Sequence, residues 1–210
     1  MNADRGQGIP EGWRTVPLGD LCDIQAGGPA LRRSQAVPDG VPLVRPADLR
    51  HRRISPEPGM PRVPPERARD LSRHRLVAGD MLVSRTGTVG RVALVTADEQ
   101  EWLYNSHLLR VRPHDPEQTL YLVAYVARRA TGEWLESRAV GTTGMRSITV
   151  RTLLDLPVLL PPVEQQRDIG AALASVDEKI RAHEDIVRTT GALRDTLSDL
   201  LMSGRLPPRP

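Results

Sequence analysis

The pattern of apolar and polar positions divides the chain at one place, the proline pair Pro161-Pro162. Before this pair, short apolar or alternating runs are separated by glycine and proline, which is typical of short strands and turns. After it, apolar residues recur at helical spacing for about 40 residues without a proline. We therefore expect an α+β protein with a compact, strand-rich domain over residues 1–160 and a long coiled-coil-type helix over residues 161–206.

The strongest strand signal lies in residues 74–95, "HRLVAGDMLVSRTGTVGRVALV". It predicts a strand, a tight turn and a second strand, because Gly87 and Gly90 can take the positive φ that a hairpin turn requires. Weaker patterns predict a strand or short helix in 12–28, strands in 41–49 and 102–113, a helix in 116–137, and loop then strand in 141–161. Residues 50–69 have neither period, so we expect a surface loop there, ordered or mobile.

The predicted long helix carries an apolar stripe along one side. Steps of four and three residues, taken alternately from Ile169, reach nine further positions, of which six are aliphatic. The aliphatic positions of this seam are Ile169, Leu173, Val176, Ile180, Val187, Leu197 and Leu201. Such a stripe needs another helix to cover it, as in a coiled coil. Gly191 and the polar steps predict a break or a register shift in the distal half.

Composition and motifs exclude several classes of protein. The single Cys22 excludes an internal disulfide framework and a cysteine-rich zinc site. No stretch approaches the roughly 20 apolar residues of a membrane helix, and the polar N-terminus lacks a signal-peptide core. The chain also lacks the histidine spacing, phosphate loop, nucleophile elbow and dinucleotide fingerprint that mark metal or catalytic sites. We therefore expect a non-catalytic, cytoplasmic protein without a cofactor or metal of its own.

Positive charge is concentrated in the first half of the chain. Residues 31–91 hold thirteen arginines and six carboxylates, a net charge of +7 against +3 for the whole chain. This asymmetry favours a polyanionic partner, although a solvated basic surface without a partner also explains it. Proteins that bind single strands or RNA usually stack bases on aromatic rings, and this chain has three Trp, three Tyr and no Phe. Double-stranded DNA is therefore the favoured partner.

Three segments carry the candidate DNA-binding residues. In the hairpin, Ser84, Arg85, Thr88 and Arg91 offer hydroxyl and guanidinium donors to phosphates or base edges. The segments "VRPADLRHRRI" and "GTTGMRSIT" add Arg45, Arg50, Arg52, Arg53, Thr142, Thr143 and Arg146. Arginine suits this role because its planar guanidinium can bind guanine or phosphate through two hydrogen bonds. A plain structural turn, an ordinary charged surface and a solvent loop are the alternative interpretations of these segments.

Four segments, taken in order, resemble a known family: "GWRTVPLGDLCDIQAGG", "LVAGDMLVSRTGTVGRVAL", "LRVRP" and "LPVLLPPVEQQRDIGAALASVDEKI". Together with the closing "LRDTLSDLLMSGRL", they have the order and spacing found in specificity subunits of type I restriction–modification enzymes. The resemblance covers residues 13–206. Its most specific part is "LPPVEQQRDI" leading into the long helix, and the glycine hairpin is the next most specific.

The resemblance implies a target recognition domain that reads one half of a split DNA site. The long helix would act as a spacer and dock the methyltransferase subunits. Catalysis would belong to the partners: an adenine methyltransferase that uses S-adenosylmethionine and, where present, a translocase–nuclease. Family members contain two recognition domains and two such helices, whereas this sequence has one of each and no internal repeat. It is therefore expected to be a half-sized specificity subunit.

Two copies could pair their long helices antiparallel and read a split palindromic site as a homodimer. Alternatively, a helix of a partner subunit could cover the seam. Two further alternatives stay open at this point: a detached recognition module of another DNA-modifying or defence system, and a coiled-coil scaffold that does not bind DNA.

Overall fold

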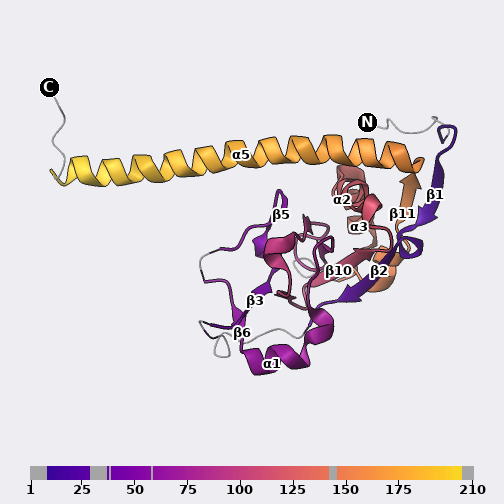
Figure 1. The fold of residues 1–210 in the computed structure, drawn as a ribbon, viewed down its shortest axis with the longest axis horizontal. Coiled ribbons are helices and arrows are strands. Elements are labelled where there is room, and N and C mark those ends of the chain that lie inside the picture. Colours follow the sequence, from indigo (N-terminus) through magenta and orange to yellow (C-terminus); the bar gives the residue numbers. More distant parts are fainter. Residues whose placement is uncertain (1–8, 29–36, 38, 58, 142–145, 205–210) are drawn as a thin grey trace. The chain divides into compact units, whose positions relative to one another are not determined.

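The computed structural model describes residues 9–28, 37, 39–57, 59–141 and 146–204 of the chain (Figure 1). The chain divides into two compact units, Met1–Leu173 and Ala174–Pro210. The first unit holds the described strands and the shorter helices. The second unit begins within the long helix, α5 (Val163–Met202).

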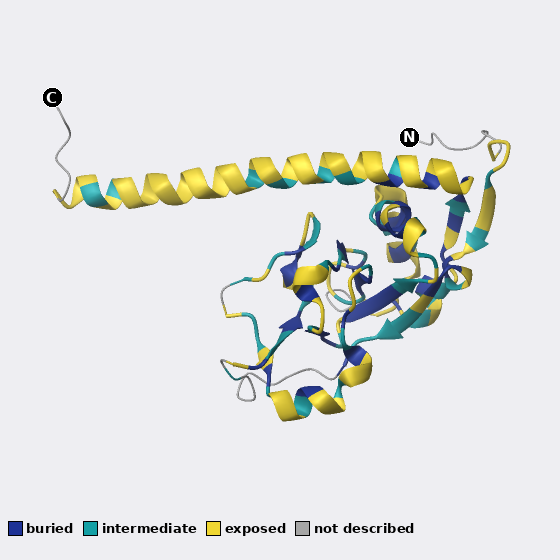
Figure 2. Cartoon of the chain, viewed as in Figure 1, coloured by how far each residue is buried: buried dark blue, intermediate teal, exposed yellow. Residues whose placement is uncertain are grey.

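A six-stranded sheet forms the centre of the first unit. Its strands lie in the order β2 (Cys22–Ala26), β10 (Leu108–Pro113), β7 (Met81–Ser84), β8 (Val92–Leu94), β5 (Arg52–Ile54) and β4 (Leu49–Arg50). The neighbouring strands are antiparallel except β5 and β8, which run parallel and align Arg52 with Ala93. All four residues of β7 are buried, and buried segments are gathered among the strands of the first unit (Figure 2). The hairpin predicted from the glycine turn is therefore the middle of the sheet.

Alternation along the strands gives the sheet two apolar faces. Val83 and Leu109 belong to a cluster on one face, whereas Leu82 and Leu108 belong to a second cluster on the opposite face. Three helices contribute to the first cluster: α2 (Thr119–Val126), α3 (Arg129–Arg138) and α4 (Val150–Leu154). Tyr104 packs in the second cluster. Apolar clusters thus pack against both faces of the sheet.

Two smaller sheets complete the first unit. β1 (Arg14–Pro17) pairs antiparallel with β11 (Pro157–Leu160), which brings the beginning and end of the domain together. The other sheet has the order β6 (Arg62–Val63), β3 (Val41–Val44) and β9 (Leu103–Tyr104). Short helical segments link these strands: Leu18–Asp20, Pro46–Asp48, α1 (Pro65–Asp70), Ser72–His74, Ala97–Glu99 and Pro116–Gln118.

Helix α5 starts directly after the proline pair that ends β11. Proline has no N–H to extend a sheet, but its carbonyl can begin a helix. Here the Pro162 carbonyl accepts the Gln166 N–H at 3.0 Å, and the buried Gln166 side chain donates to the Pro161 carbonyl at 2.7 Å. Gly170 lets the first turns approach α2, because a Cβ there would lie 2.7 Å from the Tyr121 nitrogen. At 40 residues, α5 is about 60 Å long.

The expected α+β fold with a long C-terminal helix is confirmed. The predicted boundary at residues 160/161 stays a prediction. Among the described residues, no helix combines the length and the apolar character that a membrane span requires.

Several local predictions were wrong. Residues 12–28 form two strands rather than one element, and residues 50–69 contain β5, β6 and α1 rather than a loop. The helix predicted in 116–137 is two helices, because Arg128 between them is extended at φ −71° and ψ 151°. The break predicted at Gly191 is absent from α5, which runs unbroken through this residue.

Candidate nucleic-acid interface

The turn between β7 and β8 is held from inside by Ser84. Gly87 and Gly90 have positive φ, 72° and 83°, as the turn requires. The buried Ser84 hydroxyl donates to the Thr88 carbonyl at 2.6 Å and accepts the Arg91 N–H at 2.8 Å. Ser84 therefore closes the turn from a buried position, and its predicted contact with DNA stays a prediction. The side chains of Thr88 and Arg91 are exposed at the tip.

Arg85 joins the hairpin to two other segments. Its N–H donates to the His107 carbonyl at 2.9 Å, and its carbonyl accepts the Ile148 N–H at 2.9 Å. Its side chain is half-buried, and the buried Nε has no hydrogen-bond acceptor in the described structure. Beside it, the Thr86 hydroxyl and His107 Nδ1 lie 2.8 Å apart. Sequence reasoning missed Thr86 and His107, because only the β7–β10 register brings them together.

A second basic turn lies at the same end of the sheet. Arg50 and Arg53 face each other across β4 and β5, so His51 and Arg52 form a two-residue turn. Both have positive φ, 47° and 59°, as a type I′ turn requires. Because β5 and β8 run parallel, the Arg50–His51 end of this hairpin and Arg91 precede the same end of their strands. Arg50 also forms an ion pair with Glu57.

Two of the predicted arginines are engaged in holding the fold. Arg45 forms two hydrogen bonds with the buried Asp48 carboxylate, at 3.1 and 3.0 Å, and this bonding raises the pKa of Arg45. Arg146 donates to the carbonyls of Glu136 and Ala139 at 2.7 and 3.1 Å, at the C-terminal end of α3. Both interactions are typical structural uses of guanidinium. Thr142 and Thr143 lie outside the described residues.

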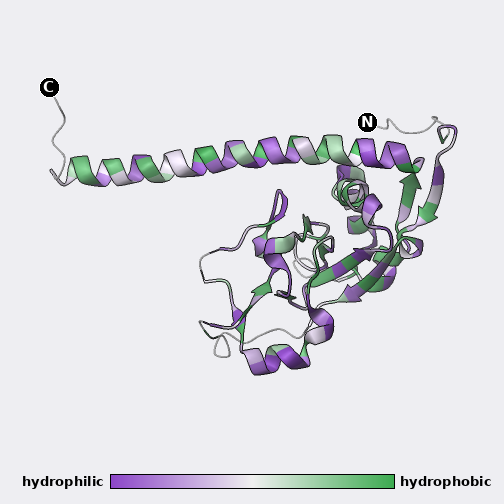
Figure 3. Cartoon of the chain, in the orientation of Figure 1, coloured by the Kyte–Doolittle hydropathy of each residue, from purple (hydrophilic) through white to green (hydrophobic). Residues whose placement is uncertain are grey.

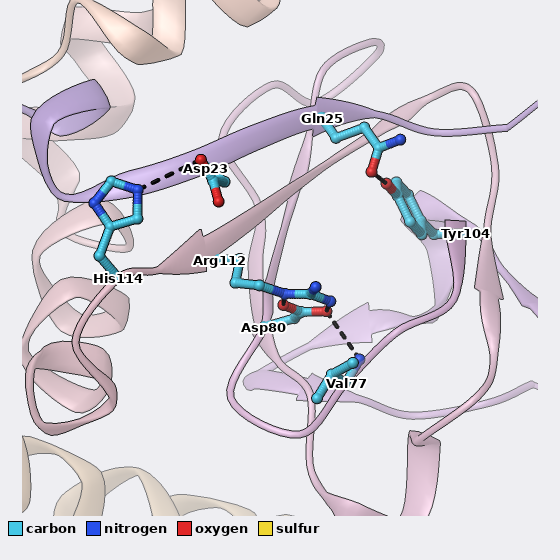
Figure 4. Close-up of polar contacts among 7 residues, drawn as sticks. All are labelled: Asp23, Gln25, Val77, Asp80, Tyr104, Arg112 and His114. Carbon is cyan, nitrogen blue, oxygen red and sulfur yellow. Dashed lines mark hydrogen bonds and ion pairs between the residues drawn. The ribbon is translucent and has the colours of Figure 1, made fainter. Parts of the chain in front are cut away.

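The face of the six-stranded sheet that packs against Tyr104 also carries a polar cluster (Figure 4). The buried Asp80 carboxylate accepts three hydrogen bonds: from Arg112 Nε at 2.6 Å, from Arg112 Nη2 at 2.8 Å and from the Val77 N–H at 2.9 Å. This pairing raises the pKa of Arg112. The Tyr104 hydroxyl donates to Gln25 Oε1 at 3.4 Å, and burial raises the pKa of the phenol to about 12.

The seam of α5 is largely uncovered. Ile169 packs partly against the core of the first unit. Six other seam positions are between 41% and 72% exposed: Leu173, Val176, Ile180, Val187, Leu197 and Leu201. Hydrophobic segments recur along the whole helix (Figure 3), although most of its surface is exposed (Figure 2). A stripe of this kind is typical of an interaction surface.

In the described part of the chain, no group of three or more His, Cys, Asp or Glu side chains could hold a metal ion. What the structure does bring together is two basic turns on one sheet end. A family model described as the type I restriction modification DNA specificity domain matches residues 10–188. The chain belongs to this family. Membership confirms the expectation of a recognition subunit without catalytic residues or a cofactor of its own.

Similarity to individual proteins agrees with the specificity-domain family. The chain is 26% identical over 179 residues to a Methanocaldococcus jannaschii protein assigned as the specificity subunit of the type I restriction enzyme MjaX. This match covers 82% of the chain but 41% of the relative.

Solved structures share the fold of the specificity domain. One is the type I restriction–modification S subunit from M. genitalium, with a TM-score of 0.64, 16% identity, and coverage of 96% of this chain and 48% of that one. Another is the HsdS subunit from Thermoanaerobacter tengcongensis, with a TM-score of 0.59, 24% identity, and coverage of 86% and 41%. A third comes from a study of complex assembly and conformational transition in a type I system, with a TM-score of 0.61, 24% identity, and coverage of 91% and 45%. The chain spans less than half the length of each of these relatives.

Proposed function

We propose that this specificity domain binds double-stranded DNA through the two basic turns at one end of its six-stranded sheet. The observation that carries the proposal is this pairing of turns within a DNA specificity domain. The proposed contacts are Arg50, Arg52, Arg53, Arg85, Thr88 and Arg91. Arginines would bind phosphates and fix the register on the duplex, while Thr88 and Arg91 at the tip would reach base edges.

The chemistry belongs to partner subunits in this proposal. An adenine methyltransferase would use S-adenosylmethionine to methylate a base taken out of the duplex, and a translocase–nuclease would cut unmethylated DNA where one is present. The specificity domain supplies the choice of site and no reacting group. This division agrees with the family's description as a specificity domain.

We further propose that the seam of α5 pairs with the same helix of a second copy. The exposed seam positions support this, because six aliphatic side chains at coiled-coil spacing are costly to leave in water. Antiparallel pairing would make the dimer twofold, and a twofold protein reads two identical half-sites with a fixed spacer. A helix from a different specificity chain is the other candidate cover.

DNA contact is tested by replacing Arg85 and Arg91 together with alanine. Each lost phosphate contact lowers the slope of log K against log salt by about 0.9, so the double variant should lose up to about 1.8. Fluorescence anisotropy with a labelled duplex at several salt concentrations measures this slope. Arg14→Ala, on exposed strand β1, is the control and should leave the slope unchanged. An unchanged slope in the double variant excludes the hairpin from the interface.

Helix pairing is tested by sedimentation velocity at micromolar concentration. Wild type should have twice the mass of the chain, whereas Ile180→Glu with Leu197→Glu should be monomeric. A monomeric wild type argues against the homodimer.

The biological role is tested by mapping adenine methylation in the native host with and without the gene. Loss at a split palindrome supports the homodimer, and loss at an asymmetric split site points to a second recognition domain. No change in a strain that expresses its methyltransferase favours a detached module or a scaffold.

A further inference from the structure

Arg110, at the centre of β10 (Leu108–Pro113), is a buried cation. It faces Gln25 on β2 and Leu82 on β7, and it is 9% exposed. In the described part of the chain, its buried Nε has no hydrogen-bond partner. The nearby carboxylate does not serve it, because Asp80 is already bound by Arg112 and by the Val77 N–H (Figure 4). Because burial of a charge is costly unless the charge is paired, a bound anion would stabilise a guanidinium in this position.

His74 supplies a second buried donor without an acceptor in the described structure. Its Nε2 lies 3.1 Å from Arg73 Nε, which can only donate, so Nε2 accepts and the proton of the neutral ring lies on Nδ1. The residue is 5% exposed, and Nδ1 also has no partner in the described structure. Burial, Arg73 and Arg110 lower the pKa of His74, which keeps the ring neutral.

The two donors belong to one group of side chains around Tyr104. The His74 ring packs edge-on against the Tyr104 ring, with centroids 5.8 Å apart. Arg110, Arg112, Arg73 and Asp80 all act electrostatically on the Tyr104 phenol. The group therefore holds three guanidinium groups and one carboxylate, and that carboxylate is already paired. Positive charge and the two buried donors, Arg110 Nε and His74 Nδ1, are thus gathered around Tyr104.

We infer that Arg110 and His74 form a binding site for a phosphate group on the Tyr104 face of the six-stranded sheet. A phosphate offers several acceptor oxygens and a negative charge, and Arg110 Nε and His74 Nδ1 have no acceptor in the described structure. The source we expect is the DNA backbone, and this part rests on the proposed function. Ala26, the last residue of β2, pairs with Leu109. The next pair along β10, Leu108 with Ser84, leads directly into the hairpin turn. The site thus lies on the same sheet as the basic turns, below their end. Free inorganic phosphate is the alternative source.

The test compares Arg110→Met with Arg14→Met, which removes the same charge from an exposed strand. With a duplex of arbitrary sequence, Arg110→Met should lower the salt slope by about 0.9 and weaken binding about tenfold at 0.1 M salt. Arg14→Met should not. The melting temperature of free Arg110→Met should not fall, because Nε of the native guanidinium has no hydrogen bond to lose within the described structure. His74→Phe, which keeps a ring against Tyr104, should weaken DNA binding in the same direction.

A second measurement separates the two sources. If inorganic phosphate raises the melting temperature of wild type more than chloride at equal ionic strength, and not that of Arg110→Met, the site binds free phosphate. The site then stands even when the DNA slope of the variant is unchanged. If neither phosphate nor DNA distinguishes the variants from wild type, the inference is wrong. Failure of wild type to bind DNA at all would refute the proposed function, while the phosphate measurement would still test the site.

Discussion

The His51–Arg52 turn allows a test of whether its residues lower the stability of the fold while Arg52 contributes a positive charge to DNA binding. Both residues have positive φ, although a left-handed conformation costs an L-residue roughly 1–2 kcal/mol. Asn-Gly is the preferred sequence for such a two-residue turn. The double substitution His51→Asn with Arg52→Gly should therefore relieve the strain and keep the Arg50–Arg53 pairing that closes the hairpin.

The free energy of unfolding should rise by about 1 kcal/mol. The relief of strain is larger than this, but the greater conformational freedom of glycine in the unfolded chain offsets about 0.5–1 kcal/mol of it. For a chain of this size, that corresponds to a rise of roughly 2–4 °C in melting temperature. Differential scanning calorimetry measures the gain, and anisotropy with duplex DNA measures what is lost. Removal of the Arg52 charge should lower the salt slope by about 0.9.

Arg52→Ala is the matched control. It removes the same charge but keeps a residue with a Cβ in the strained position, so DNA binding should weaken without any gain in stability. If the double variant is no more stable than Arg52→Ala, the turn is not strained and the reasoning fails. If it is more stable but binds DNA as wild type does, the turn lies outside the interface.

Three further outcomes are expected. Gly191 has open space around it, so Gly191→Ala should stabilise α5 by up to about 1 kcal/mol. Gly170→Ala should be about 1–3 kcal/mol less stable than Gly191→Ala, because a Cβ at Gly170 would lie 2.7 Å from a backbone nitrogen of α2. Equal melting curves for the two variants would contradict this packing. Arg112→Met should cost about 3 kcal/mol in urea denaturation by leaving Asp80 buried and unpaired, and a loss below 1 kcal/mol would be inconsistent with that burial. Because the folded pKa of His74 lies below its ordinary value of 6.5, the unfolded chain binds more protons, so stability falls as the pH drops below about 6.5; His74→Phe should show a shallower fall between pH 7.5 and 5.5.

Local patterns predicted the hairpin and the long helix because each depends on residues close together in sequence. Gly87 and Gly90 can adopt the positive φ of a tight turn, and residues 163–206 contain no proline to end the helix. Gly191 did not break the helix, since one glycine costs only about 1 kcal/mol against the surrounding turns.

The candidate site was harder to predict, because the role of an arginine depends on its tertiary neighbours. Arg146 binds the Glu136 and Ala139 carbonyls at the C-terminal end of α3, which lie ten and seven residues away along the chain. In "LRVRP", alternation indicates that Arg110 and Arg112 share one face of a strand. It does not reveal that Asp80 pairs with Arg112, while in the described structure Nε of the buried Arg110 has no partner.

The Ser84 hydroxyl has a consequence for how this protein can evolve. It forms hydrogen bonds with the backbone of Thr88 and of Arg91, so the exposed side chains at the tip contribute little to folding. Substitutions of Thr88 and Arg91 can therefore accumulate with little loss of stability. Mutation could alter what the tip contacts while the central strands stay unchanged, which separates the freedom to change specificity from the need to remain folded.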